Sequence, residues 1–198
     1  MRDFLIDFKK YRSLSEGNMI ALAIVDMLVD FIRDNGALPV PAAKKIIPNI
    51  QKLLAFARKN GWKIFFIADN HLENDKEFEI WGRHSVKGTV GSQVIEELTP
   101  EPGELIIPKT RYSAFYNTQL DAVLHQNKIE SLIITGTLTD ICVLYTAADA
   151  RNRDLDVIIV SDATASLSKK RHNWALEHAK TVLNVKIKSC AEILGSSL

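Results

Sequence analysis

The chain is poor in cysteine. Only two of its 198 residues are cysteines, Cys142 and Cys190, and no C-x-x-C pair is present. Two cysteines make no disulfide framework, and the absence of C-x-x-C excludes the common zinc-ribbon and thioredoxin patterns. This usage indicates a reducing compartment, so we expect a cytoplasmic protein.

The sequence also lacks a long apolar run and an excess of charge. Its first 18 residues mix charges through their apolar positions, and no later segment approaches the length of a membrane span. The 25 Lys and Arg against 24 Asp and Glu give a formal charge of +1, which provides no electrostatic case for nucleic acid or an anionic membrane. No G-x-G-x-x-G follows the first apolar run, so a dinucleotide site lacks its phosphate-binding turn. The expected partner is a small molecule.

What is present is enough apolar sequence for one buried core. The hydrophobic content is 46%, and the length fits one domain with a short extension. We expect residues 19–198 to form this domain. Residues 1–18 are predicted to be a helical extension, because Phe4, Leu5, Phe8 and Tyr11 fall at helical spacing before a polar break.

Six apolar segments read as strands, and helical patterns separate most of them. The strands are expected at Met19–Val25, Trp62–Ala68, Glu104–Pro108, Ser131–Thr135, Asp156–Val160 and Val185–Lys188. Helices are expected at 41–60, 91–98, 119–126 and 142–150, and through Trp174 and His178. This alternation predicts an α/β fold, a three-layer α/β/α doubly wound parallel sheet.

An acid, an amine and a sulfur follow three of these strands. Asp26 comes directly after the first, Lys109 after the third, and Cys142 shortly after the fourth, where it is expected to open a helix. Ligands of open α/β sheets bind beyond the strand ends, and N–H groups at a helix start favour a thiolate. The alternatives are a structural aspartate, a solvated lysine and a buried, inert cysteine.

The polar segment 69–88 is long for a connection in a compact domain, which is typical of functional loops. It holds Asp69, His71 and His84, a mixed carboxylate and imidazole set that suits a divalent metal such as Zn, Fe or Mn. The alternative is a set of solvated loop residues. We interpret His172 and His178 as surface or helix-packing residues, and Cys190 as structural.

Three segments carry a family resemblance. GTLTDICVLYTAADA, at 136–150, resembles the nucleophile segment of the isochorismatase-like cysteine hydrolases, which include nicotinamidases, pyrazinamidases, N-carbamoylsarcosine amidases and isochorismatases. Asp26 with the later Asp30-Phe31 pair matches the family's first segment, and KTRYSAFYNTQLD, at 109–121, matches its lysine segment. The resemblance covers most of the chain from Met19 onward. It implies the strand order 3-2-1-4-5-6 and a homodimer or higher homo-oligomer.

The resemblance also implies catalytic roles. Asp26, Lys109 and Cys142 would form a catalytic triad, with Cys142 as nucleophile and Asp26 as the group that takes and returns the proton. The family carries a cis peptide just before the nucleophile, which here would join Thr137 to Leu138. The N–H groups of Leu138 and Cys142 would then form the oxyanion hole.

By the same resemblance, nicotinamidases bind a metal through a D-x-H and a second His in a segment like W-P-x-H. The matching residues are Asp69, His71 and His84, with Gly82 in place of the usual proline. Glu77 is the expected fourth ligand, with Glu79 as the fallback. We expect zinc, with iron or manganese as the other candidates.

The substrate pocket is expected to have aromatic walls from Phe31, Trp81 and Tyr112, against which a flat ring stacks. A bound metal would hold the ring nitrogen of a pyridine carboxamide, which favours nicotinamidase activity, from nicotinamide to nicotinate plus ammonia through a thioester. Because Gly82 and Met27 depart from common nicotinamidase residues, another amide or ureido substrate, as in N-carbamoylsarcosine amidase, stays open. A noncatalytic small-molecule-binding homologue is the other alternative.

Overall fold

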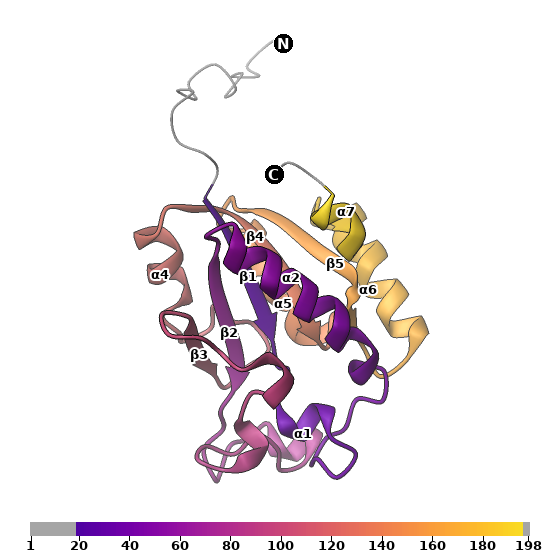
Figure 1. Ribbon diagram of the computed structural model, residues 1–198. Coiled ribbons are helices and arrows are strands. Elements are labelled where there is room, and N and C mark those ends of the chain that lie inside the picture. Colours follow the sequence, from indigo (N-terminus) through magenta and orange to yellow (C-terminus); the bar gives the residue numbers. More distant parts are fainter. Residues whose placement is uncertain (1–18, 196–198) are drawn as a thin grey trace, which may run out of the picture.

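A six-stranded parallel sheet forms the centre of the molecule, with its strands in the order β3-β2-β1-β4-β5-β6. The computed structural model describes residues 19–195, and the helical extension predicted for residues 1–18 lies outside them. The predicted doubly wound order 3-2-1-4-5-6 is confirmed (Figure 1). The strands are β1 (Met19–Val25), β2 (Lys63–Asp69), β3 (Leu105–Lys109), β4 (Ile129–Thr137), β5 (Asp156–Ala165) and β6 (Lys186–Lys188).

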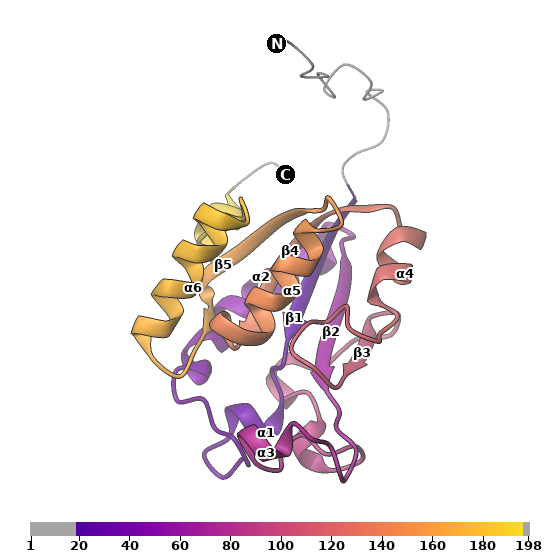
Figure 2. The same ribbon diagram turned by 180° about the vertical axis from the view of Figure 1, so that it is seen from behind.

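Helices cover both faces of the sheet. Helices α2 (Ile47–Lys59) and α7 (Cys190–Leu194) lie on one face (Figure 1), and α4 (Leu120–Gln126), α5 (Leu144–Arg151) and α6 (Lys169–Val182) lie on the other (Figure 2). Two short helices, α1 (Val29–Ile32) and α3 (Phe78–Trp81), lie beyond the carboxyl ends of the central strands. Among the described residues, no helix is long and apolar enough to cross a bilayer.

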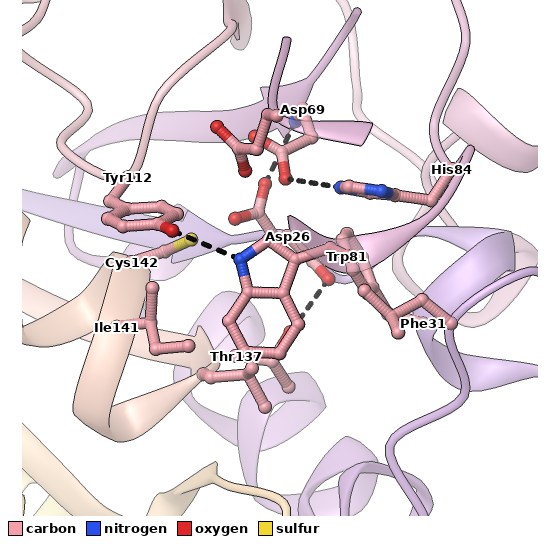
Figure 3. Close-up of a pocket in the computed structure, with 12 residues that line it drawn as sticks. Asp26, Phe31, Asp69, Trp81, His84, Tyr112, Thr137, Ile141 and Cys142 are labelled. Carbon is pink, nitrogen blue, oxygen red and sulfur yellow. Dashed lines mark hydrogen bonds and ion pairs between the residues drawn. The ribbon is translucent and has the colours of Figure 1, made fainter. Parts of the chain in front are cut away.

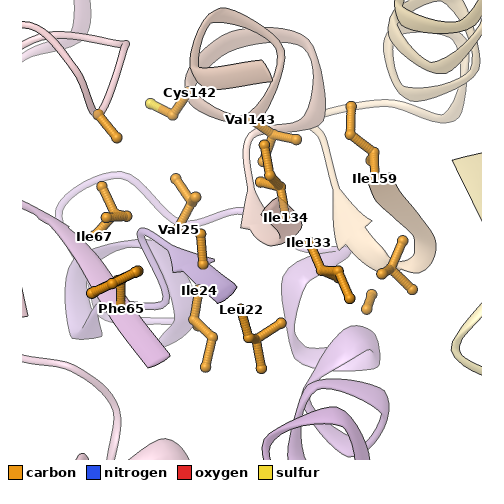
Figure 4. Close-up of a cluster of buried hydrophobic side chains, with 14 of the residues drawn as sticks. Leu22, Ile24, Val25, Phe65, Ile67, Ile133, Ile134, Cys142, Val143 and Ile159 are labelled. Atoms are coloured by element: carbon orange, nitrogen blue, oxygen red, sulfur yellow. The ribbon is translucent and has the colours of Figure 1, made fainter. Parts of the chain in front are cut away.

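The central strands are apolar on both sides because helices cover both of their faces. In β1 every residue after Met19 is buried, and in β4 the run from Leu132 to Thr137 is buried. Their side chains meet those of β2, β5 and the turn before α5 in one cluster (Figure 4). Each fully buried leucine or isoleucine contributes about 1.5–3 kcal/mol of transfer free energy. The carboxyl ends of these strands therefore start from a continuous buried core.

The sequence was misleading at residues 91–98, where a short helix was predicted. The structure has two separate 3-10 turns there, at Val90–Ser92 and Glu96–Leu98. Between them the backbone is extended, and Val94 forms an antiparallel bridge with Leu28. Tertiary pairing with the segment after β1 thus outweighs the local helical pattern.

Strands β1 and β4 are neighbours at the point where the strand order reverses. Gly136 makes this close pairing possible, because a Cβ built on it would lie 2.0 Å from the carbonyl oxygen of Val25, and its φ is +104°. Beyond this point the ends of four strands come together. They deliver Asp26 after β1, Asp69 at the end of β2, Lys109 at the end of β3, and the turn that carries Cys142 after β4.

Candidate active site

Lys109 lies between the acid and the sulfur. Its Nζ is 2.8 Å from Oδ2 of Asp26 and donates to Sγ of Cys142 over 3.4 Å. All three side chains are buried. The structure therefore brings together the acid, the amine and the sulfur that the sequence places at separate strand ends.

Asp69 is a fourth member of this group. Its Oδ1 accepts a hydrogen bond from Lys109 Nζ, and its backbone N–H donates to Oδ1 of Asp26 over 2.9 Å. The sheet register explains the contact, because Asp69 and Lys109 are paired residues on β2 and β3. The buried ammonium is thus shared by two carboxylates.

Burial and charge set the protonation of the three candidate catalytic groups. Burial alone would lower the pKa of Lys109, but the carboxylates of Asp26 and Asp69 outweigh it and hold that pKa well above its usual value, so the amine is charged. Burial, helped by the nearby Asp69 charge, raises the pKa of Asp26 to about 6 against the opposing effect of Lys109. Asp26 is therefore ionised at neutral pH and ready to accept a proton.

The thiol of Cys142 differs from the sequence expectation. Burial raises its pKa above the usual value, and this outweighs the lowering effect of Lys109. In the resting protein Cys142 is therefore a thiol, where we expected a readily formed thiolate. Proton transfer to Asp26, whose side chain interacts with that of Cys142, becomes the step that generates the nucleophile.

The turn that carries Cys142 is also different in detail. Cys142 lies in a five-residue π-helix, Thr139–Val143, and α5 begins only at Leu144, so the prediction that Cys142 opens the α-helix is wrong by two residues. The peptide bond between Thr137 and Leu138 is cis. The Thr137 hydroxyl donates a hydrogen bond to the carbonyl oxygen of Asp26 over 2.9 Å, which connects this turn to the end of β1.

Two further contacts fix the turn to α6. Asp140, which is buried, accepts hydrogen bonds from the Ser166 hydroxyl and the Arg171 guanidinium. Thr139 Oγ1 lies 2.9 Å from His172 Nδ1. The interpretation of His172 as a surface or packing residue missed this bond, because nothing in the local sequence relates α6 to the turn.

A narrow pocket opens above Cys142 (Figure 3). It encloses about 310 Å³ of empty space, including its opening to solvent. Trp81 and Tyr112 stand at this pocket, and the indole Nε1 donates to the tyrosine hydroxyl over 3.0 Å. The lining residues are Asp26, Phe31, Leu38, Asp69, Glu77, Trp81, His84, Tyr112, Thr137, Leu138, Ile141 and Cys142.

Four side chains beside this pocket could hold a metal ion. One ligand atom from each of Asp69, His71, Glu77 and His84 lies within 4.8 Å of the others, and all four residues are buried. The two histidines present Nε2 to the same oxygen, Oδ2 of Asp69, at 3.7 and 3.8 Å. Glu79, the fallback ligand, is exposed and outside this cluster.

The chemistry of this cluster fits a cation. His71 Nε2 is buried without a hydrogen-bond partner, which is costly unless something else satisfies it. Burial alone would lower the pKa of both histidines, but Asp69 outweighs it and holds each pKa above its ordinary value. Two imidazoles and two carboxylates suit zinc, iron or manganese.

In both histidines the ring is oriented by a hydrogen bond at Nδ1, the nitrogen that does not face the cluster. His71 Nδ1 lies 3.1 Å from Oδ2 of Asp75, and His84 Nδ1 lies 2.8 Å from the carbonyl oxygen of Gly82. Arg111 in turn holds both oxygens of Asp75, at 2.9 and 3.1 Å. Neither Asp75 nor Arg111 was predicted as a site residue. The only signal was an extra acid inside the polar loop, which by itself carries little information.

Comparison with known proteins agrees with this geometry. The family profile of the isochorismatase domain matches residues 20–194. The chain belongs to the isochorismatase family. Members of this family are hydrolases. The strand order of the described sheet, 3-2-1-4-5-6, is that of the isochorismatase-like fold.

Three solved relatives show what this isochorismatase-family chain is similar to. An N-carbamoylsarcosine amidase from Thermoplasma acidophilum is 37% identical with a TM-score of 0.82, over 89% of this chain and 99% of that one. The nicotinamidase/pyrazinamidase PncA from Bacillus subtilis is 33% identical with a TM-score of 0.82, over 86% and 100%. A pyrazinamidase from Pyrococcus horikoshii, solved in complex with zinc, is 32% identical with a TM-score of 0.81, over 86% and 98%.

Proposed function

We propose that this isochorismatase-family protein is a cysteine-dependent amidohydrolase whose substrate is nicotinamide, which it converts to nicotinate and ammonia. One observation carries the proposal. The candidate nucleophile Cys142 and the metal-donor residues Asp69, Glu77 and His84 line the same pocket. A flat carboxamide could therefore present its amide carbon to the sulfur and a ring nitrogen to the metal side.

The proposed reaction begins with proton transfer from the Cys142 thiol to Asp26. The thiolate attacks the amide carbon, and the N–H groups of Leu138 and Cys142 receive the negative oxygen of the tetrahedral intermediate. Asp26 then gives its proton to the departing nitrogen, and ammonia leaves a thioester on Cys142. A water then loses its proton to Asp26 and attacks the thioester carbonyl, and the C–S bond breaks. Asp26 returns the proton to the Cys142 sulfur, and the acid product leaves and ionises to nicotinate.

Lys109 supports this sequence without exchanging a proton. Its ammonium lies 3.4 Å from the sulfur and 2.8 Å from Asp26, so it stabilises negative charge on whichever of the two carries it. In the resting protein the pKa of Lys109 is held well above the usual value, so we assign Lys109 the role of a fixed cation. It is the electrostatic partner of the acid and the nucleophile.

Asp69, His71, Glu77 and His84 would hold the divalent metal, most simply zinc, with iron and manganese as the other candidates. When bound, such an ion supplies a Lewis-acid position for the ring nitrogen of a pyridine carboxamide. Trp81 and Phe31, which line the pocket, would confine a flat ring there.

The charge of the pocket supports a neutral amide over a ureido acid. Among the described residues that line it, none is a lysine or an arginine, whereas Asp26, Asp69 and Glu77 are acids. N-carbamoylsarcosine carries a carboxylate, and proteins usually bind that group with arginine or lysine. Nicotinamide carries no such charge.

The test measures ammonia release from the purified protein, loaded in turn with Zn²⁺, Fe²⁺ or Mn²⁺. We expect release from nicotinamide, little from N-carbamoylsarcosine, and none from either after Cys142→Ser. Cys190→Ser is the matched control, because that buried thiol lies in α7, which packs against α2, and bonds to the Asn49 carbonyl rather than to a residue of the site. Faster ammonia release from N-carbamoylsarcosine would indicate a ureido substrate instead of nicotinamide. No release from either compound would show that the proposed amidohydrolase activity is wrong.

We further propose that the protein works in the cytoplasm as a homo-oligomer. Both cysteines are free, which agrees with a reducing compartment. The oligomer is what the family resemblance implies, and light scattering on the purified protein measures it.

A further inference from the structure

We propose that Asp75 is a positioning residue of the metal site, where it orients two of the four donors. This inference rests on the proposed function, since it concerns the same metal. Asp75 Oδ2 lies 3.1 Å from His71 Nδ1. A carboxylate can only accept, so it selects the tautomer with hydrogen on Nδ1 and leaves the Nε2 lone pair directed at the cluster.

The same carboxylate also reaches Glu77. The backbone N–H of Glu77 donates to Oδ1 of Asp75 over 2.9 Å. Asp75 thereby uses one oxygen for His71 and the other for Glu77. His71 precedes Asp75 in the loop and Glu77 follows it, and the Asp75 carboxylate connects the two donors.

Asp75 is itself held in place. Its side chain is only 7% exposed, and Arg111 Nη1 bonds to both of its oxygens. Arg111 follows the catalytic lysine by two residues, so the anchor of Asp75 comes from the end of β3. A side chain with both oxygens occupied in this way is preorganised before any metal arrives.

The second histidine offers an internal comparison. His84 Nδ1 is bound by the carbonyl oxygen of Gly82, which no side-chain substitution removes. A change at Asp75 should therefore loosen the His71 and Glu77 half of the site and leave the His84 half intact. Removing a carboxylate behind a metal-bound histidine weakens metal binding about 10- to 100-fold.

The experiment titrates metal-free protein with Co²⁺ and follows its visible absorption, with calorimetry of Zn²⁺ binding as a second readout. We expect the dissociation constant of Asp75→Ala to rise about 10- to 100-fold. Asp75→Asn should lie between this variant and the wild type, because the amide keeps an acceptor oxygen at only one of the two positions that His71 and Glu77 use. The metal-free proteins are compared by thermal unfolding, which separates metal affinity from a general loss of stability.

Glu73→Gln is the matched control. Glu73 lies in the same loop and pairs with Arg83, but its side chain is 67% exposed and it is not one of the cluster residues. We expect its metal affinity to equal that of the wild type.

The outcomes separate this inference from the proposed function. If the wild type binds metal and Asp75→Ala binds it within a factor of about two, or Glu73→Gln is weakened equally, the positioning role is wrong while the metal site stands. If the wild type binds no metal, the positioning role and the metal site both fail, and the ammonia assay alone then decides the amidohydrolase. Should Asp75→Ala not fold, an unchanged affinity in Asp75→Asn overturns the role and a weakened one supports it.

Discussion

Lys109 is a lysine with no access to water, held by two carboxylates and a sulfur. A buried ion pair contributes little net stability when it is intact, because desolvation offsets the attraction, but breaking it leaves an uncompensated charge. Two carboxylates depend on this one ammonium. The side chain therefore has structural and chemical consequences that one substitution should expose together.

Lys109→Met should abolish amide hydrolysis and lower the free energy of unfolding by about 3–5 kcal/mol, because Asp26 and Asp69 lose their shared cation. Chemical denaturation of the metal-free protein and the ammonia assay measure the two effects. The control Lys59→Met removes an exposed lysine of α2 and should change neither. A stable, active Lys109→Met protein would refute the assigned role.

Single residues were predicted unequally well. Asp26, Lys109 and Cys142 could be placed from the sequence, because each follows an apolar strand and the family segments match around them. The protonation state of Cys142 could not, since it depends on burial by side chains distant in the chain. Asp75 was missed for a related reason, as its role follows from contacts with His71 and from Arg111 across the loop.

At the scale of elements, the end of α3 explains why glycine suits the position where the family resemblance led us to expect a proline. The structure places Gly82 at the C-cap of α3 with φ +74° and ψ 172°, a conformation that is essentially restricted to glycine. Its N–H donates to the carbonyl oxygen of Phe78, and its own carbonyl oxygen orients His84. The proline usual at this position could satisfy neither the angle nor the N–H bond.

Restoring that proline should therefore damage the protein. Gly82→Pro should cost about 3 kcal/mol or more, from the lost N–H bond and a ring that fixes φ near −65°. Gly82→Ala should cost about 1–3 kcal/mol, because only the backbone angle is strained. Gly195→Ala, at a position with φ of −90°, is the control expected to melt like the wild type. Thermal unfolding gives the order, and a Gly82→Pro protein as stable as the wild type would contradict it.

A second element-scale link joins α2 to the turn before β3. Arg58 on α2 forms a two-point ion pair with Glu104, at 2.8 and 2.9 Å. Burial alone would raise the pKa of Glu104, but Arg58 and the N–H of Glu101 outweigh it and hold that pKa below its usual value. A carboxyl with a lowered pKa in the folded state stabilises the protein above its unfolded pKa, about 4.3, and loses this effect as the pH falls through the folded value.

Glu104→Gln should accordingly lower the free energy of unfolding by about 1–3 kcal/mol at neutral pH. The difference from the wild type should shrink as the pH falls below about 4, because the wild-type carboxyl is then protonated as well. Urea denaturation at several pH values measures it. Glu96→Gln, at an exposed position, should show a small difference at every pH. If the free energy of unfolding of Glu104→Gln stays below that of the wild type by the same amount in acid, the carboxylate charge is not the cause of the difference.

The bounds of the strands could be predicted from the sequence where both faces of the strand are buried. The runs that became β1 and β2 were predicted to within a residue, since a continuous apolar segment ended by a polar residue has few alternatives in an α/β domain. Prediction failed where partners distant in the chain decide the backbone. The segment 91–98 pairs with residues after β1, and β5 extends to Ala165 because it continues to pair with β4.

At the scale of the whole molecule, the described residues 19–195 by themselves supply a six-stranded sheet, the acid, amine and sulfur, and the metal-donor cluster. Deleting residues 1–18 should therefore leave nicotinamide hydrolysis unchanged and the free energy of unfolding within about 0.5 kcal/mol of the full chain. Light scattering on both proteins should give the mass of a homo-oligomer. A monomeric truncated protein beside an oligomeric full chain would instead make the extension an interface element, and loss of hydrolysis would make it part of the active enzyme.

Asp69 belongs to two pieces of machinery at once. One of its oxygens accepts from Lys109, and the other faces both imidazoles. Replacing Asp69 would remove a metal ligand and also change the charge near the Cys142 thiol. An inactive Asp69 variant would therefore not show which of the two losses abolished activity. His71 faces the same Asp69 oxygen as His84 but is not among the residues that line the substrate pocket, so a His71 variant is the cleaner test of whether hydrolysis needs a metal.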